Sequence, residues 1–172
     1  MARRMIRLLS FVTALLLTLE SRAEDNLGHV DIFVSIDCPI ANAYAPELSR
    51  IYHEFSPVGF DFYLIYPDPT TTAADIEDHR REYFLTIPGM RDPNHERVKT
   101  AGASITPEVA VFDSEDKLLY RGGIDNLFNA YGDKRRATTK NYLRNILKDI
   151  LEGKDLSFTQ TVPIGCFIEP IP

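Results

Sequence analysis

The stretch His29–Pro39, HVDIFVSIDCP, decides the fold that the sequence predicts. Residues 29–36 are mostly β-branched or aromatic, which predicts a largely buried strand. Cys38 follows this strand, and Pro39 stands where a proline can open a helix. From residue 39 to 55 the apolar side chains recur at helical spacing, at Tyr44, Leu48, Ile51, Tyr52 and Phe55. A strand that leads directly into a helix is typical of the first half of a β-α-β unit.

Outward from this stretch, further strands and helices follow in a definite order. The remaining strands are predicted at Phe60–Tyr66, Glu108–Phe112 and Lys117–Arg121. The remaining helices are predicted at Thr72–Phe84, at Asp92–Ala101 with Asp92 as cap, and up to Leu151 after a cap at Thr138 or Thr139. A polar loop is predicted over residues 122–137 and an irregular tail over residues 154–172. This β-α-β … β-β-α order predicts an α/β fold with a four-stranded mixed sheet flanked by helices.

The first 23 residues have the layout of a secretory signal peptide. Three arginines precede the apolar run Leu8–Leu19, and the small residues Ser21 and Ala23 occupy the −3 and −1 positions of a cleavage site. We therefore expect cleavage after Ala23 and export to the periplasm or the medium, with residues 24–172 as a single domain. The apolar run is shorter than the roughly 20 residues of a membrane-spanning helix, so no stable membrane span is expected after cleavage.

Composition excludes several classes of protein. The 172-residue chain has a net charge of −6, and loss of the predicted signal peptide, with four arginines and one glutamate, lowers the charge to −9. Because nucleic-acid binding depends on Lys and Arg that neutralise phosphates, we expect no nucleic-acid partner. Two cysteines are too few for a disulfide-rich scaffold or a four-cysteine zinc site, but outside the cytosol they can form a disulfide.

Cys38 is the residue that says most about chemistry. A thiol at a helix N-terminus faces unpaired N–H groups and the positive end of the helix dipole, and both favour the nucleophilic thiolate. The neighbouring Asp37 opposes this effect, because a nearby anion disfavours the thiolate. The alternative is an unreactive cysteine that packs in the core as a small apolar side chain.

Around Cys38 the chain resembles the thioredoxin-like superfamily. The segment Cys38–Pro46, CPIANAYAP, resembles the thioredoxin stretch C-G-P-C-K-M-I-A-P, with the same interval from cysteine to proline. Thr106-Pro107, before a hydrophobic strand, resembles the segment that carries thioredoxin's cis-proline, and an X-Pro bond adopts the cis form at a cost of only about 0.5–1 kcal/mol. We therefore expect a cis bond before Pro107.

Two further features extend this resemblance over residues 29–153. Leu119–Gly123 resembles thioredoxin's last strand and its glycine. The long interval between Tyr66 and Thr106 is similar to the redoxin branch, which includes the TlpA-like exported proteins and the alkyl hydroperoxide reductase/thiol-specific antioxidant group.

The chain departs from the thioredoxin pattern at the second sulfur. Ala41 occupies the place of thioredoxin's second active-site cysteine, so the dithiol motif is broken. The peroxiredoxin pattern P-x-x-x-[TS]-x-x-C is half met, with Ser35 in place but Asp31 where the proline belongs. Any resolving thiol must therefore be Cys166 or external. The alternative role for Cys166 is a structural disulfide with Cys38.

The resemblance implies an exported thiol–disulfide oxidoreductase. Cys38 would attack a substrate disulfide, Thr106 and Pro107 would border the substrate chain, and Cys166 or an external thiol would resolve the mixed disulfide. The partner would be a protein disulfide or dithiol, or a small thiol, and the chemistry needs no metal or organic cofactor. The alternatives are a thiol peroxidase, in which Cys38 is oxidised to sulfenic acid, and a non-catalytic binding module with a structural Cys38–Cys166 disulfide.

Other polar residues allow simpler interpretations. His79, on the solvated helix 72–84, is expected at the surface. Glu108 either lies near Cys38 or is solvated, and Arg121 either orients a peroxide or is a surface charge. The basic run at residues 134–136 is expected to be a solvated loop.

Overall fold

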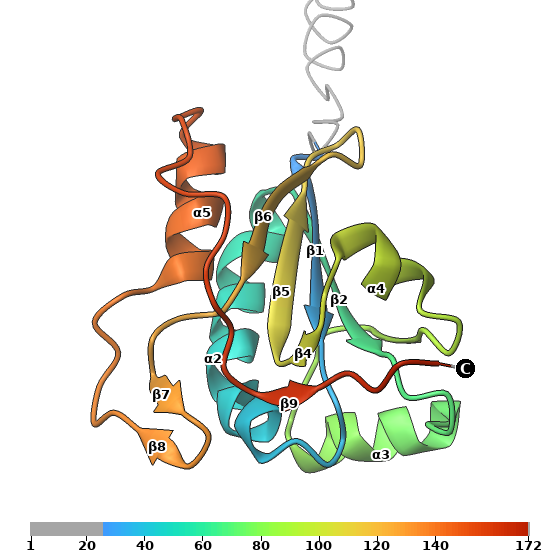
Figure 1. Ribbon diagram of the computed structural model, residues 1–172. Coiled ribbons are helices and arrows are strands. Elements are labelled where there is room, and N and C mark those ends of the chain that lie inside the picture. The colour runs from blue at the N-terminus through green and yellow to red at the C-terminus, as the bar shows by residue number, and fades with distance from the viewer. Residues whose placement is uncertain (1–25, 172) are drawn as a thin grey trace, which may run out of the picture.

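A mixed five-stranded sheet forms the centre of the molecule (Figure 1). The computed structural model describes residues 26–171, so the predicted signal peptide, residues 1–23, lies outside the described residues. In spatial order the strands are β3 (Gly89–Arg91), β2 (Phe60–Tyr66), β1 (Gly28–Phe33), β5 (Glu108–Phe112) and β6 (Leu118–Gly122). β1 runs parallel to β2 and antiparallel to β5, and β5 and β6 form an antiparallel hairpin. The predicted mixed α/β architecture is confirmed.

The sheet has one strand more than the four predicted. The additional strand, β3, pairs in parallel with the end of β2. It has three residues at the sheet edge, so it is too short to show the alternation of apolar and polar side chains that identifies a strand. Glycine suits this position, because a Cβ at Gly89 would lie 2.5 Å from Ile76 Cγ2 on the adjacent helix.

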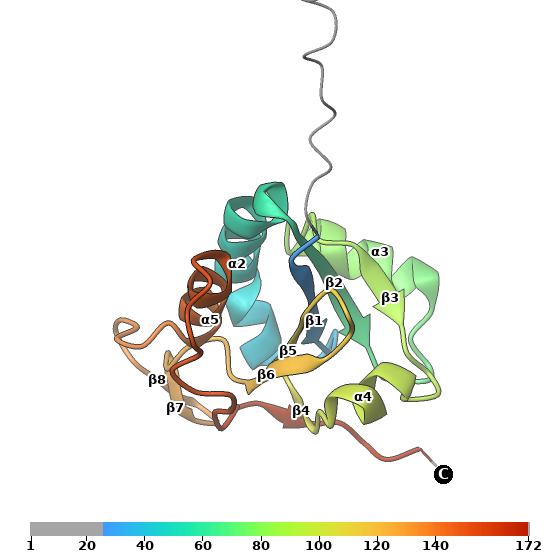
Figure 2. The same cartoon turned by 90° about the horizontal axis from the view of Figure 1, so that it is seen from above.

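Helices cover both faces of the sheet (Figure 2). One face packs against α2 (Pro39–Phe55), α3 (Ala73–Glu82) and α5 (Tyr142–Leu151), and the other against α4 (Glu96–Ala101). A 3-10 turn, Ser56–Val58, links α2 to β2. Four of the predicted apolar positions of α2 are buried in the larger core, namely Tyr44, Leu48, Ile51 and Phe55. None of the helices described is long and apolar enough to cross a membrane.

The helix α4 begins later than predicted. Its N-cap is His95, with left-handed backbone angles, and not Asp92. Asp92 nevertheless serves the helix end, because its carboxylate accepts hydrogen bonds from Glu96 N at 2.8 Å and Val98 N at 3.0 Å. Asp92 thus accepts hydrogen bonds from the first N–H groups of α4, as a capping residue does, although it lies three residues before the N-cap.

The last helix, α5, also begins later than predicted, after Asn141. Thr138 and Thr139 do not cap it, because their hydroxyl groups hydrogen bond to Asp125 and Asn126 in the preceding loop. This loop is not irregular throughout, as it contains the short hairpin of β7 (Phe128–Ala130) and β8 (Asp133–Lys134). Strands of two or three residues give no recognisable pattern in a sequence.

After α5 the chain returns along the edge of the sheet. Arg121 N donates to Thr159 O and Thr161 N donates to Arg121 O, both at 3.1 Å, so this part of the tail lies against β6. Further on, β9 (Cys166–Phe167) pairs antiparallel with β4 (Ile105–Thr106) and passes below the lower end of the sheet in Figure 1. The predicted irregular tail therefore contains one short strand.

Candidate active site

Strand pairing brings Cys38 and Pro107 to the same end of the sheet. β1 and β5 are antiparallel, with Phe33 opposite Glu108. The residues that follow β1 therefore lie beside those that precede β5. Cys38 belongs to the first group and Thr106-Pro107 to the second, and the bond between Thr106 and Pro107 is cis, as predicted.

Cys38 is the N-cap residue of α2, directly before Pro39. Its backbone is extended, with φ −84° and ψ 107°, and its carbonyl oxygen accepts a hydrogen bond from Asn42 N at 3.0 Å. The thiol makes no capping hydrogen bond to the helix. The sulfur is therefore placed at the positive end of the helix dipole without being used to hold that end together.

The sulfur of Cys38 contacts both Thr106 and Cys166. The Cys38 thiol donates to Thr106 O at 3.0 Å, and the Cys166 thiol donates to Cys38 Sγ at 2.8 Å. A disulfide bond is about 2.05 Å long, so the two cysteines are free thiols in contact. All four residues that the sequence assigns to the site, including Pro107, thus lie together. Cys38 is only 1% exposed, whereas Cys166 is partly exposed.

The surroundings of Cys166 keep it protonated. Burial raises the pKa of the Cys166 thiol from 9.0 to about 11, and its hydrogen bond to Cys38 and the repulsion between two thiolates act in the same direction. At neutral pH Cys166 is therefore a thiol that donates a hydrogen bond to the sulfur of Cys38. This arrangement suits Cys38 as the acceptor of that bond and hence as the first sulfur to react.

Glu108 holds β4 in place from inside the fold. It is 2% exposed, and its carboxylate accepts hydrogen bonds from Ser104 N at 2.8 Å and Ile105 N at 3.2 Å. Burial raises the pKa of Glu108, while these N–H groups and Arg121 act against this shift. The guanidinium of Arg121 lies between Glu108, at 3.4 Å, and the carbonyl of Gly102. Glu108 is thus buried and not solvated. Arg121 is not a free surface charge, because it contacts Glu108 and the carbonyl of Gly102.

His79 is buried, although the sequence predicts a surface position. It is 3% exposed, with Nδ1 at 2.8 Å from the Tyr66 hydroxyl and Nε2 at 2.9 Å from Asn42 Oδ1. Asn42 in turn donates to Ile36 O at 2.8 Å, in the loop that leads to Cys38. The signal in the sequence is weak but present, because His79 shares one helical face with the buried Ile76.

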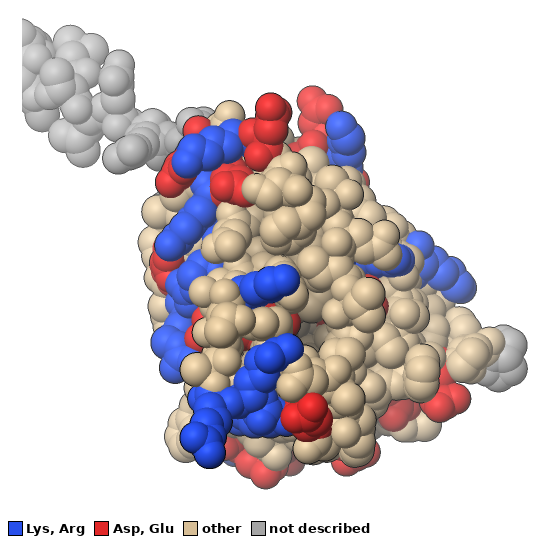
Figure 3. Space-filling model, turned by 60° about the vertical axis from the view of Figure 1, so that its left-hand side comes forward, with Lys and Arg blue, Asp and Glu red and all other residues tan. Residues whose placement is uncertain are grey.

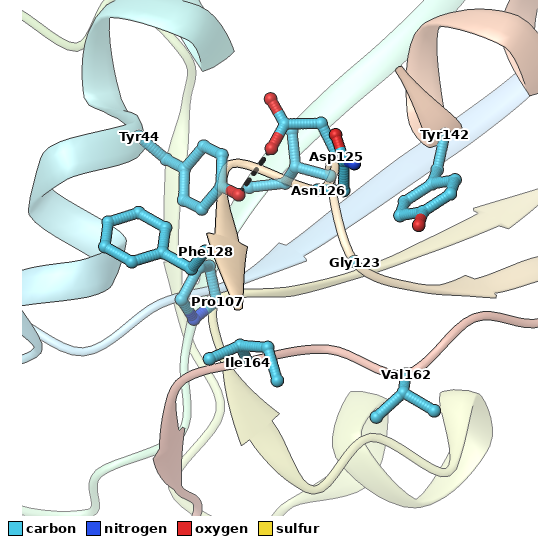
Figure 4. Close-up of a pocket in the computed structure, with 10 residues that line it drawn as sticks. Tyr44, Pro107, Gly123, Asp125, Asn126, Phe128, Tyr142, Val162 and Ile164 are labelled. Carbon is cyan, nitrogen blue, oxygen red and sulfur yellow. Dashed lines mark hydrogen bonds between the residues drawn. The ribbon is translucent and has the colours of Figure 1, made fainter. Parts of the chain in front are cut away.

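Two hollows flank the tail where it passes the site. The smaller, of about 60 Å³, lies between Tyr44 and the tail residues Val162 and Ile164, and it borders Pro107 (Figure 4). The Tyr44 hydroxyl donates to Asp125, another residue that lines this hollow, at 2.5 Å. On the opposite flank, a hollow of about 200 Å³ is lined by residues that include Ser35, His95, Thr106, Phe167 and Ile168.

Charge is distributed unevenly around the site. An acidic hollow of about 320 Å³ lies beside the loop before Cys38 and includes the carboxylates of Asp37, Asp68, Asp75, Asp78 and Glu82. On the face shown in Figure 3, basic side chains gather over the flank that carries α5 and the β7–β8 hairpin. The run at residues 134–136 is exposed, as predicted, but Lys134 belongs to β8 and not to a loop. Within residues 26–171, no group of three or more His, Cys, Asp or Glu is arranged to hold a metal ion.

Comparisons with known proteins bear on the fold. No family model matches the chain, and no curated protein matches its sequence. A conserved protein of uncharacterised function from Geobacillus kaustophilus is 25% identical, with a TM-score of 0.76 over 89% of this chain and 82% of the other. A hypothetical protein from Sinorhizobium meliloti 1021 is also 25% identical, with a TM-score of 0.73 over 84% and 80%.

A third solved structure has a described activity. It is a secreted disulfide oxidoreductase of Mycobacterium tuberculosis, 14% identical, with a TM-score of 0.50 over 76% of this chain and 84% of the other. The neighbours share the arrangement of sheet and helices found here, in agreement with the resemblance around Cys38 and Pro107. The described chain has a thioredoxin-like fold.

Proposed function

We propose that the protein is an exported thiol–disulfide oxidoreductase whose redox pair is Cys38 and Cys166. One observation carries the proposal: two sulfurs separated by 128 residues lie 2.8 Å apart, at the N-terminus of a helix. A thioredoxin-like fold with its usual second cysteine replaced by Ala41 thus has a second thiol supplied by the tail. The pair need move by less than 1 Å to form a disulfide, given the S–S bond length of about 2.05 Å.

The reaction proceeds in two exchange steps. The Cys38 thiolate attacks one sulfur of a substrate disulfide, forming a mixed disulfide, and the other substrate sulfur leaves as a thiolate that takes up a proton. The Cys166 thiol then loses its proton to solvent and attacks Cys38 Sγ, which releases the second substrate thiolate. The substrate gains two electrons, and the protein is left with a Cys38–Cys166 disulfide. The same steps in reverse oxidise a substrate dithiol.

The neighbouring residues act on position and charge. The N-terminus of α2 stabilises the Cys38 thiolate, and the Cys166 S–H group donates to it. Thr106 O lies 3.0 Å from Cys38 Sγ, and Pro107 follows it, so these two residues border the path of a substrate. Glu108 is a positioning residue, because it holds the backbone that carries Thr106.

The predicted export would suit redox chemistry of this kind. The signal-peptide pattern of residues 1–23 would deliver residues 24–172 as one domain to a compartment where disulfides persist. The partner is then a protein disulfide or dithiol, or a small thiol. The secreted disulfide oxidoreductase with a similar fold supports this assignment.

The reduction potential of the purified mature protein tests the proposal. Equilibration with glutathione or dithiothreitol buffers, with intact mass as readout, measures the Cys38–Cys166 couple. We expect a potential above about −300 mV, in the range of working redox couples. A much lower potential indicates a structural disulfide and contradicts the proposal. Rapid consumption of hydrogen peroxide by the reduced protein, without exchange with disulfides, identifies a thiol peroxidase in its place.

A further inference from the structure

Cys38 is covered in the structure, although the proposed function requires a substrate to reach it. Its side chain is 1% exposed, and its sulfur lies between Thr106 O at 3.0 Å and Cys166 Sγ at 2.8 Å. A substrate disulfide must approach the attacking sulfur in line with its own S–S bond. The tail that carries Cys166 must therefore move before the first exchange step.

The tail is held at the site through its backbone. In the β4–β9 pair Phe167 lies opposite Ile105 and Cys166 opposite Thr106, and Ile168 N donates to Ser104 O at 3.0 Å. The side chain of Phe167 is 80% exposed and contributes little to this hold. A pair of two-residue strands belongs to the elements that open locally at low cost.

The tail is thus bound as an extended polypeptide whose cysteine reaches Cys38. Such binding depends on main-chain hydrogen bonds along a strand edge, which any polypeptide can make. β4 offers this edge, and Glu108 fixes it from the other side. When the tail leaves, Ser104 O and the backbone groups of Thr106 become available to another chain, while Ile105 N stays bound to Glu108.

Gly165 adds a requirement on sequence. A Cβ at this position would lie 2.7 Å from Thr106 C, closer still to Thr106 O, and 2.9 Å from Ile105 Cγ2. A chain that follows the path of the tail therefore needs glycine immediately before its cysteine. The hollow at Pro107 and Ile164 (Figure 4) leaves room for the residues before the cysteine, and the hollow at Ser35 and Phe167 leaves room for those after it.

We propose that the segment Gly165–Ile168 is an intramolecular surrogate for the substrate. The edge of β4 binds an extended polypeptide with the order Gly-Cys, and this polypeptide and the tail exclude each other. The inference rests on the proposed function and adds its substrate class. Substrate displaces β9 and reacts with Cys38, and the returning tail brings Cys166 to the mixed disulfide as it displaces the product chain.

The test measures the first exchange step alone. All variants of the mature protein carry Cys166→Ser, so that the mixed disulfide on Cys38 is trapped. Gly165→Ala and, separately, Ile168→Pro release β9, the first by overlap with Thr106 and the second by loss of the N–H that binds Ser104 O. Ser157→Ala is the control, because Ser157 is an exposed residue of the tail that lines neither hollow. Hydrogen exchange at residues 166–168 verifies release.

Three probes release the same coloured thionitrobenzoate. One is the small symmetrical thionitrobenzoate disulfide. The others are peptides with the sequence of residues 162–169, carrying thionitrobenzoate on their cysteine, with either glycine or alanine before it. We expect both release variants to react about tenfold faster than the parent with the small disulfide and the glycine peptide, because the tail no longer occupies the site. The Ser157→Ala variant should match the parent, and the glycine peptide should react about tenfold faster than the alanine peptide.

Each result separates one claim from another. Equal rates for the two peptides overturn the assignment of β4 as the docking edge. Release variants that exchange quickly at residues 166–168 but react no faster than the parent overturn the tail as the cover of Cys38. If no folded variant reacts with any probe and only denatured protein does, the proposed function itself fails.

Discussion

Cys166 lies directly opposite Thr106 in the antiparallel pair of β4 and β9. This register places the Cys166 sulfur 2.8 Å from the Cys38 sulfur, whose thiol also donates to Thr106 O. The second sulfur of the site thus comes from the far end of the chain, held by backbone pairing, and not from the helix that carries the first. The position of the second thiol therefore depends on a strand of two residues.

Cys38 should be the more reactive thiol of the reduced protein at neutral pH. Cys38 is the N-cap of α2, whereas burial raises the pKa of Cys166 to about 11. Iodoacetamide alkylation of the single variants Cys38→Ser and Cys166→Ser between pH 6 and 9 measures the difference. We expect the protein that keeps Cys38 to react faster at pH 7. Faster alkylation of the protein that keeps only Cys166, at pH 6 to 7, would reverse the assignment of the nucleophile.

Closure of the internal disulfide should accelerate with pH well into the alkaline range. Cys166 attacks as the thiolate, and burial still raises the pKa of its thiol when Cys38 carries glutathione, so its thiolate fraction grows about tenfold for each pH unit below that raised pKa. The protein with glutathione attached at Cys38 provides the starting state, and release of glutathione is followed by stopped-flow mixing and mass spectrometry. A rate that levels off near pH 8 or 9 contradicts the raised pKa. The Cys166→Ser variant, which cannot close, is the control.

Much of the fold could be predicted, because long elements carry strong patterns. The helix 39–55 and the strand 60–66 are recognised from spacing and residue type, and the structure places them as predicted. Short elements escaped prediction. β3 and β9 have three and two residues, too few for a pattern, and they form because a neighbouring strand offers free backbone groups.

The sequence predicts which residues form the candidate site but not how they contact one another. Cys38 and Pro107 have local signals, a helix start and a proline before a strand. The contact of Cys38 with Cys166 depends on the path of residues 154–165, which no local pattern determines. Glu108 and His79 were the least predictable, because a polar residue in a strand or helix is usually solvated, and their burial depends on partners distant in sequence.

Replacement of Glu108 should weaken the fold. In Glu108→Leu the N–H groups of Ser104 and Ile105 lose their acceptor, and Arg121 loses its partner. A hydrogen bond to a charged group contributes about 1.5–3 kcal/mol, so we expect the free energy of unfolding in urea to fall by about this amount. The exposed Glu115 offers a control, Glu115→Leu, that should leave unfolding unchanged. Conversely, equal urea concentrations at the midpoint of unfolding for the two variants would show that Glu108 does not hold β4.

The stability of the protein should fall below neutral pH through His79. Burial lowers the pKa of His79 from its ordinary value of 6.5, so the unfolded chain binds a proton at a pH where the native ring is still neutral. The stability from this residue is therefore complete above pH 6.5 and is lost as the pH drops below that value. Urea unfolding at intervals between pH 7.5 and 5 measures the loss.

The variant His79→Leu should remove part of this pH dependence and lower stability at pH 7.5 by about 1–3 kcal/mol, because the Tyr66 hydroxyl and Asn42 lose their shared partner. The exposed His53, on α2, provides the control His53→Leu, which should keep the dependence of the parent. The freed Asn42 should also loosen the loop at Ile36, so the thionitrobenzoate reaction of Cys38 in the Cys166→Ser background reports on the same change. An unchanged unfolding profile and an unchanged Cys38 rate in His79→Leu together contradict a link from α3 to the active-site loop.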